Sequence, residues 1–169
     1  MGSNNNRVDF LLFFCYNTEP KRKDIMKVVF LDFNGVLDTS DNFDEINETN
    51  LYILVDAINL TDSKVVITSS NKDSFYRTGK HNKIMQNLIN ALHSHNVEVL
   101  GYTKKLNSRE EEIMEYLKSH PEITHYCILD GDYFFESMKE HQIKLTNQMD
   151  GGNGLQETTT YEIVRKLQI

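Results

Sequence analysis

Short apolar runs recur along the chain, and most of them are followed directly by polar or acidic residues. The runs cover residues 27–31, 64–68, 97–100 and 126–129, and a weaker fifth run covers 142–145. A continuous apolar run of this length, without alternation, is typical of a strand that is buried on both faces. Such strands occur mainly in parallel sheets covered by helices, so the runs leave few architectures open.

Helical patterns separate these runs. Apolar residues recur at helical spacing around 51–58, 84–92, 113–117 and 161–167, and Ser108 is the expected N-cap of the third helix. Strands that alternate with helices imply right-handed crossovers and a parallel sheet. The sequence therefore predicts an α/β fold, a Rossmann-like three-layer αβα sandwich with a mainly parallel five-stranded sheet.

The length of the chain allows one domain, which we assign to residues 26–169 of 169. Residues 1–25 are interpreted as an N-terminal extension, either partly a tag or an added edge strand, because they lack the cleavage site of a secretory signal. Cys15 and Cys127 lie far apart and form no CxxC pair. This spacing argues against a disulfide framework or a zinc site, and it makes the cytoplasm the expected location.

Charge and hydropathy exclude two classes of partner. The formal net charge of −7 argues against a surface that wraps duplex nucleic acid, which requires a basic stripe. No apolar run approaches the ~20 residues of a membrane-spanning helix, so no membrane partner is expected. A local basic pocket for one phosphate is compatible with both observations.

Acidic side chains follow the first and fourth apolar runs. Asp32, Asn34 and Gly35 come after the first run, and residues 130–132 (Asp-Gly-Asp) come after the fourth. In open parallel sheets ligands bind beyond the carboxyl ends of the strands. Two groups of carboxylates at that edge repel each other unless a cation lies between them, and Mg²⁺ prefers such oxygen ligands. The sequence therefore predicts a magnesium site.

Hydroxyl and basic side chains near the same edge are candidates for holding a phosphoryl group. The hydroxyls end the second run, and most of the basic residues precede or open the third helix. Each has an ordinary alternative as a cap, a loop residue or a solvated charge. They are Thr68, Ser69, Ser70, Lys72, Lys104, Lys105 and Arg109.

Taken in order, these motifs resemble the four signatures of the haloacid dehalogenase (HAD) superfamily. Residues 28–37 resemble the first signature, a strand followed by Asp-x-Asp-Gly, and residues 65–68 resemble the second, a strand that ends in Thr or Ser. Residues 128–132 resemble the acidic fourth signature. Arg109 fits the spacing of the basic third signature, with two nearby lysines as alternates.

The closer resemblance is to the HAD domains of RNA-repair proteins. These carry a Ser-Ser-Ser-Trp-Arg-like second loop and an Arg-x-x-Glu-Ile helix. The counterparts here are residues 68–72 (Thr-Ser-Ser-Asn-Lys) and residues 109–113 (Arg-Glu-Glu-Glu-Ile). The loop departs from the pattern because it lacks the Trp and has Lys72 in place of Arg.

The resemblance implies a Mg²⁺-dependent phosphomonoester hydrolase. Asp32 would attack phosphorus and form an aspartyl-phosphate, which water hydrolyses. Thr68 and Arg109 would hold the transferring oxygens. Mg²⁺ would be held by Asp32, the backbone carbonyl of Asn34, and Asp130 or Asp132. The residues assigned to substrate binding are Gly35, Ser69, Ser70, Lys72, Lys104 and Lys105.

Asn34 departs from the family pattern, in which an Asp at this position acts as general acid and base. A carboxamide cannot transfer that proton, and loss of such a group costs about 10²–10⁴-fold in rate. Three explanations are open: Asn34 is native in an enzyme with a good leaving group or a different acid, it is a substitution that traps a complex, or the domain binds phosphate without turnover. Asp38 is the nearest other carboxylate.

The short connections imply an open site. In this family, caps that enclose small substrates follow the first or second signature, whereas segments 38–67 and 70–109 are expected to hold only core helices and strands. An open site suits a phosphorylated RNA or DNA end, or a phosphoprotein, and it also serves small substrates where a neighbouring subunit covers it. Two further hypotheses are a non-catalytic phosphate- and metal-binding module, and a phosphoacceptor like a response regulator.

Overall fold

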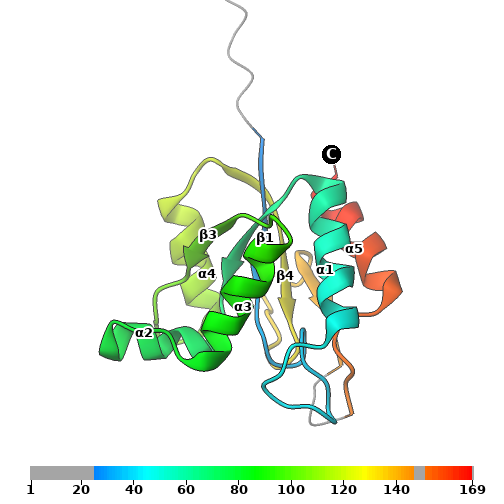
Figure 1. The fold of residues 1–169 in the computed structure, drawn as a ribbon. Helices are drawn as coiled ribbons and strands as arrows, with labels where there is room; N and C mark the ends of the chain where they lie inside the picture. Colours follow the sequence, from blue (N-terminus) through cyan, green and yellow to red (C-terminus); the bar gives the residue numbers. More distant parts are fainter. Residues whose placement is uncertain (1–24, 147–150, 169) are drawn as a thin grey trace, which may run out of the picture.

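A computed structural model describes residues 25–146 and 151–168 of the chain. The predicted N-terminal extension lies outside the described residues, apart from Ile25. The described chain forms one five-stranded sheet in the order β3-β2-β1-β4-β5, and every pair of neighbouring strands is parallel (Figure 1). The strands are β1 (Met26–Leu31), β2 (Lys64–Ile67), β3 (Val99–Tyr102), β4 (Ile123–Asp130) and β5 (Gln142–Lys144).

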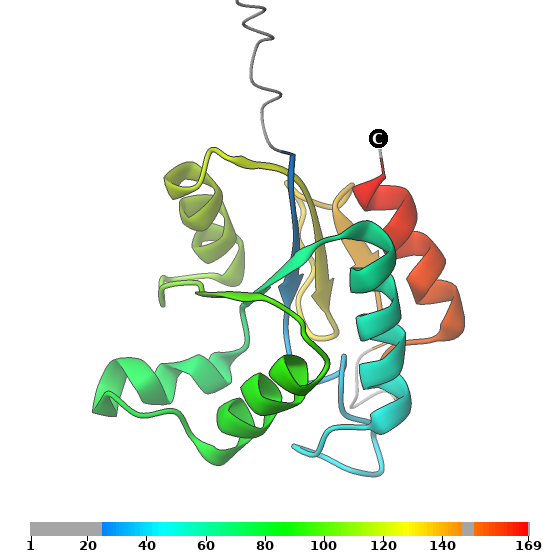
Figure 2. The same ribbon diagram turned by 45° about the horizontal axis from the view of Figure 1, so that its top comes forward.

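Helices cover both faces of the sheet, so the predicted three-layer sandwich is confirmed. One face packs against α1 (Glu48–Thr61), α3 (Lys83–Ser94) and α5 (Glu157–Leu167). The other face packs against α4 (Arg109–Ser119). Figure 2 shows the strands between α4 on one side and the α1–α5 pair on the other.

The strands owe this arrangement to apolar side chains that point both ways. Val29 and Leu31 of β1 face the layer of α1, α3 and α5, whereas Val28 and Phe30 face α4, and all four are fully buried. Burial on both faces explains why β1 is a continuous apolar run and not an alternating one. The same property places β1 in the centre of the sheet, between β2 and β4.

Side-chain caps start three of the helices. The side chain of Ser108 accepts a hydrogen bond from the backbone N–H of Glu111 at 3.2 Å, which confirms the N-cap expected for α4. Asn47 and Asn82 cap α1 and α3 in the same way. Such caps satisfy N–H groups that have no partner inside the helix.

The structure differs from the prediction at four elements. Strand β4 begins at Ile123, three residues before the predicted run at 126–129. Strand β3 lies two residues later than expected, because Gly101 and Tyr102 pair with β2. Helix α5 begins at Glu157 because a run of threonines hides its first turn from an apolar pattern. A short helix, α2 (Asp73–Thr78), was not predicted, since it buries none of its residues and so leaves no apolar period.

The topology separates this fold from that of a response regulator. The observed strand order is 3-2-1-4-5, whereas response-regulator receivers have the order 2-1-3-4-5. No inserted cap domain occurs within the described ranges, because residues 32–47 form a loop and the β2–β3 connection contains only a 3₁₀ turn, α2 and α3. No helix among these residues is long and apolar enough to cross a membrane.

Candidate active site

Two aspartates lie side by side at the carboxyl edge of the sheet. Asp32 follows β1 directly, and Asp130 is the last residue of the adjacent strand β4. The backbone N–H of Asp32 donates to the carbonyl of Leu129 at 2.9 Å, which extends the pairing of the two strands into the site. Both side chains are buried, with exposed fractions of 3% and 1%. The parallel sheet therefore brings together two carboxylates that are 98 positions apart.

The turns that follow these aspartates touch each other through their backbones. A Cβ atom added at Gly131 would lie 2.8 Å from the carbonyl oxygen of Gly35, which is closer than real Cβ contacts. Gly35 itself has a φ of 72°, a conformation that favours glycine. Gly131 was not among the predicted site residues. Because Gly131 has no side chain, the turns of the first and fourth motifs can touch. The sequence feature that could have identified it is its position directly after Asp130, the aspartate that ends β4.

Arg109 bridges the two aspartates from the start of α4. Its Nη1 lies 3.5 Å from Asp32 Oδ1 and 3.3 Å from Asp130 Oδ2. The guanidinium group is buried and stands 5.3 Å from the centre of the Tyr133 ring. A buried arginine beside two carboxylates is a fixed positive charge, and it can bind phosphate oxygens. The residue chosen for the third signature thus lies in the same cluster as the first and fourth.

The pKa of Asp130 is raised by its surroundings in this cluster. Burial, followed by the charge of Asp32, raises its pKa to about 7, although Arg109 and the backbone N–H groups of Asp132 and Tyr133 act in the opposite direction. The two N–H groups donate to Asp130 Oδ1 at 2.9 Å each. A divalent cation next to Asp32 and Asp130 would favour both ionised carboxylates.

The donor set fits Mg²⁺ through two carboxylates and main-chain oxygen. Within the described ranges, no three Asp, Glu, His or Cys side chains cluster tightly enough to hold a metal by themselves. The fit therefore requires the backbone carbonyl of Asn34 and water, and Mg²⁺ commonly keeps several waters. Asp132 is exposed and follows Asp130 in the same turn, so Asp130 is the better placed of the two predicted acidic ligands.

Thr68 presents an unused hydroxyl beside β1. It follows β2, and its backbone N–H donates to the carbonyl of Leu31 at 2.8 Å. Its Oγ1 is buried and makes no hydrogen bond. A buried hydroxyl without a partner is destabilising unless a ligand or water satisfies it, so Thr68 Oγ1 is an available donor to a phosphoryl oxygen. Of the next two serines, Ser69 is buried and caps a 3₁₀ turn, whereas Ser70 is exposed.

Lys72, predicted to bind substrate, is buried in an ion pair with Glu112. Its side chain is 1% exposed, and Nζ lies 2.8 Å from Glu112 Oε2 and 2.9 Å from the carbonyl oxygen of Thr68. Burial lowers the pKa of this amine, and the hydrogen bond to Glu112 acts in the opposite direction. Lys72 thus ties the loop after β2 to helix α4.

Glu112 joins three parts of the site and was missed as a site residue. It accepts hydrogen bonds from Lys72, from Thr103 Oγ1 at 3.1 Å and from the N–H of Leu106 at 3.3 Å. Its Oε2 also lies 3.6 Å from Arg109 Nε. The Arg-x-x-Glu spacing, which places both residues on one side of α4, was the signal that could have identified it.

The other two predicted lysines lie at the surface. Lys105 pairs with Asp73 at the edge of a cavity of about 250 Å³ that is also lined by Ser70, Arg109 and Tyr133. Lys104 is exposed and lines a different cavity, together with tyrosines of α2, β3 and α4. Lys105 therefore lines the same cavity as Arg109, whereas Lys104 lines the other cavity.

Asn34 is held by two carboxylates. Its Nδ2 donates to Asp38 Oδ2 at 2.9 Å and to Asp44 Oδ1 at 3.1 Å, while its Oδ1 lies 3.5 Å from Asn71 Nδ2. Asp38 is completely buried and also accepts from the N–H of Gly35 at 2.7 Å. An aspartate at position 34 would bring a third carboxylate to this pair. The surroundings of Asn34 therefore match a carboxamide.

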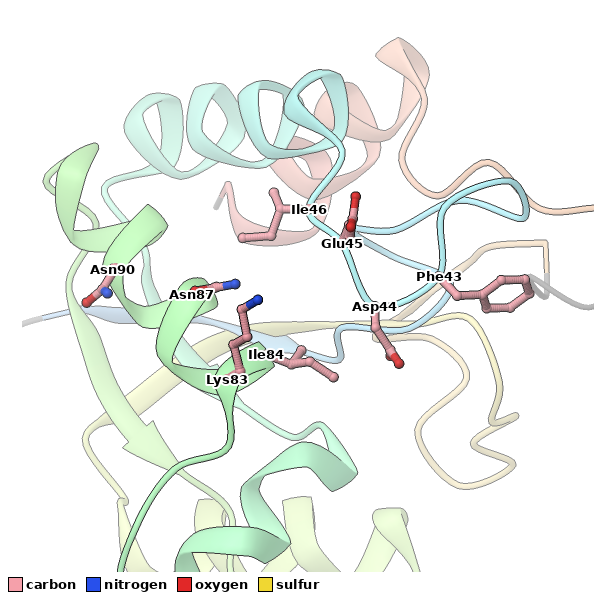
Figure 3. Close-up of a pocket in the computed structure, with 8 residues that line it drawn as sticks. All are labelled: Phe43, Asp44, Glu45, Ile46, Lys83, Ile84, Asn87 and Asn90. Carbon is pink, nitrogen blue, oxygen red and sulfur yellow. The ribbon is translucent and has the colours of Figure 1, made fainter.

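A cavity lies beside this network. It has a volume of about 600 Å³ and lies between the loop before α1 and the first turns of α3. Figure 3 shows Asp44, Ile46, Lys83 and Asn87 around it, with the ring of Phe43 pointing away. Asp44 thus links the surroundings of Asn34 to an open space.

Comparison with known families gives one match, which covers most of the chain. A family model described as "HAD domain in Swiss Army Knife RNA repair proteins" matches residues 28–159. The matched range contains Asp32, Thr68, Arg109 and Asp130, together with all five strands except the start of β1. No curated protein and no solved structure matches the chain.

Proposed function

Because the chain belongs to the family of HAD domains found in Swiss Army Knife RNA repair proteins, we propose that it is a Mg²⁺-dependent phosphohydrolase that acts through an aspartyl-phosphate at Asp32. Family membership indicates phosphatase-type hydrolase chemistry. The observation that carries the proposal is the position of Arg109, within 3.5 Å of both Asp32 and Asp130. The proposed nucleophile Asp32, the positive charge of Arg109 and the candidate metal ligand Asp130 thus lie next to each other in a buried part of the site.

In this mechanism Asp32 attacks the phosphorus atom while Arg109 and Thr68 bind the non-bridging oxygens. The bond to the leaving oxygen breaks, and a covalent phosphate on Asp32 remains. Water then attacks this phosphate and restores the carboxylate. Bound Mg²⁺ would supply charge neutralisation and orientation of the phosphoryl group. Burial of the guanidinium group strengthens its contribution, because charges interact more strongly away from water.

The open surface around the cluster supports a phosphorylated polynucleotide end as substrate. Tyr133 and Phe134 follow Asp130 closely in the chain, and their exposed fractions are 54% and 68%. Exposed aromatic rings stack on nucleobases without strong sequence preference. The net charge of −7 is compatible with contact to a chain end, and not with extended contact along a duplex.

The test is phosphate release from an aryl phosphate and from 3′- and 5′-phosphorylated oligonucleotides, with and without Mg²⁺. Turnover is expected in the parent protein and is expected to disappear in Asp32→Asn, a near-isosteric variant that removes the nucleophile. Asp62→Asn, a surface change at the end of α1, is the matched control. Absence of turnover in both the parent and Asn34→Asp would refute the proposed activity.

A non-catalytic binding module is the second candidate, and Asn34 is the observation that favours it. It predicts that Mg²⁺ and a phosphate analogue such as tungstate or orthovanadate bind the protein, while no substrate is turned over. Isothermal titration against the parent and Asp32→Asn measures this binding. Turnover that depends on Asp32 would reject this candidate.

A further inference from the structure

Attack by Asp32 leaves open how the departing oxygen is stabilised. An alcohol leaves as a strongly basic alkoxide unless a general acid protonates it. A phosphate leaving group needs no such acid, because its second pKa is about 6 and it departs as a stable anion. The proton donors around Asp32 therefore determine which phosphate esters or anhydrides the site can cleave.

The two other buried carboxylates in this cluster, those of Asp130 and Glu112, are engaged as hydrogen-bond acceptors. Asp130 accepts from two backbone N–H groups and from Arg109, and the Mg²⁺ of the proposed function would keep this carboxylate ionised in spite of its raised pKa. Glu112 accepts from Lys72, Thr103 and the backbone N–H of Leu106. A carboxylate that is satisfied by donors on both oxygens is poorly arranged to give a proton to a leaving group.

The two carboxylates around Asn34 also accept hydrogen bonds, Asp38 on both oxygens and Asp44 on Oδ1. Asp38 is fully buried and accepts from the side chain of Asn34 and from two backbone N–H groups, those of Gly35 and Asp44. Asp44 accepts from Asn34. The loop of residues 32–47 contains no histidine, and His81, in the connection between α2 and α3, stacks on Phe75 with ring centroids 4.7 Å apart.

Asn34 has no amide hydrogen left for a substrate. A carboxamide carries two N–H donors, and both point to carboxylates here, to Asp38 at 2.9 Å and to Asp44 at 3.1 Å. The residue two positions after the nucleophile thus provides neither a transferable proton nor a free hydrogen bond for the leaving oxygen. Thr68 and Arg109 remain as donors, and they suit the oxygens that stay with phosphorus.

From this arrangement we propose that the site acts on phosphoanhydrides, such as the terminal phosphate of a 5′-triphosphate end, and that Asn34 sets this preference; the proposal rests on the phosphohydrolase function argued above. In the first step the Asp32 oxygen–phosphorus bond forms, the phosphorus–bridging oxygen bond breaks, and its electron pair leaves with the departing phosphate. In the second step water attacks phosphorus, Asp32 leaves as a carboxylate, and the proton of water passes to the departed phosphate or to solvent.

The experiment compares three classes of leaving group on the intact chain in Mg²⁺ buffer. The substrates are a nucleoside 5′-triphosphate and a 5′-triphosphorylated oligoribonucleotide, 4-nitrophenyl phosphate, and the 5′-monophosphorylated form of the same oligoribonucleotide. The expected kcat/KM for the anhydride exceeds that for the alkyl monoester by about 10²–10⁴-fold, the range that a missing general acid accounts for. The aryl ester is expected to behave like the anhydride.

Two variants test the role of Asn34. Asn34→Asp is expected to raise turnover of the alkyl monoester. The ratio of kcat/KM for the anhydride to kcat/KM for the alkyl monoester should then fall toward unity. Because this change brings three carboxylates together, the double variant Asn34→Asp/Asp44→Asn moves a carboxylate from position 44 to position 34 at constant charge. Asp41→Asn, an exposed change in the same loop, is expected to leave the ratio unchanged.

The outcomes separate this proposal from the proposed function. Aryl-phosphate turnover that depends on Asp32, with no preference for anhydrides over alkyl monoesters, overturns the specificity and leaves the phosphohydrolase function standing. Loss of alkyl turnover alone in Asp44→Asn also overturns it, because Asp44 would then be the proton donor. Absence of turnover with every substrate, in the parent and in Asn34→Asp, refutes both.

Discussion

Removal of the Lys72 amine tests how much of the site depends on one buried ion pair. The side chains of Lys72 and Glu112 are 1% and 7% exposed, and their charged atoms lie 2.8 Å apart. Breaking such a pair from one side costs about 3–5 kcal/mol, because the remaining charge stays buried. Glu112 would keep its hydrogen bond from Thr103 and its ion pair with Arg109, whose Nε lies 3.6 Å away. Because these contacts remain, the loss expected from the broken pair lies near the lower limit of this range.

Lys72→Met also removes a donor from two backbone carbonyls. Lys72 Nζ donates to Thr68 at 2.9 Å and to Ser69 at 3.4 Å, and each lost hydrogen bond contributes about 0.5–1.5 kcal/mol. The expected total is therefore about 4–6 kcal/mol. With a urea dependence of about 2 kcal/mol per M, the unfolding midpoint falls by about 2–3 M.

The assay is urea unfolding followed by circular dichroism. The matched control is Lys64→Met, which breaks the exposed pair between Lys64 and Glu98, where the side chains are 33% and 59% exposed. That change is expected to cost less than about 1 kcal/mol. The double variant Lys72→Met/Glu112→Gln removes the stranded charge and is expected to be more stable than Lys72→Met alone. Equal losses in the two single variants, or a double variant that is no more stable, would refute the reasoning.

Three further predictions concern neighbouring residues. In metal-free buffer the free energy of unfolding is expected to fall as pH rises from about 4 to 7. The reason is that the unfolded chain releases the Asp130 proton near pH 3.8, whereas the folded chain holds it up to about pH 7. Urea titrations at pH 5 and 8 should give a smaller difference in the free energy of unfolding for Asp130→Asn than for the parent. Gly131→Ala places a methyl group against the backbone of Gly35 and is expected to cost about 1–3 kcal/mol and to lower turnover, and unchanged stability would argue against contact between these turns. Burial raises the pKa of the Cys127 thiol to about 12, so in a Cys15→Ser background a thiol reagent is expected to label the protein only after unfolding, which absorbance of the released chromophore measures.

Much of the site follows from the order of strands and the residues at their ends. A parallel sheet places the carboxyl ends of all its strands at one edge, so Asp32 and Asp130 were expected to meet as soon as their runs were interpreted as buried strands. Arg109 was selected among three nearby basic residues because its spacing fits the third signature of the HAD superfamily. These inferences succeed because burial on two faces and helix capping leave strong local patterns in the sequence.

Other features depend on contacts that no local pattern encodes. Lys72 resembled a phosphate-binding residue, but it is buried because Glu112, 40 positions later, provides its partner. The short helix α2 has no buried face and therefore no period to detect. The close approach of Gly131 to Gly35 depends on how two turns pack.

The sequence alone therefore determined the class of fold and the edge at which the acidic groups gather, and its resemblance to the HAD superfamily suggested Asp32 as the nucleophile. Only the tertiary structure decided how each polar group is used. A hydrogen bond needs a partner within about 3 Å, and which segments approach so closely is set by packing of the whole core. Asn34 is the clearest example. Its amide donates to Asp38 and Asp44, and the sequence did not show that the folded loop brings these two carboxylates to it.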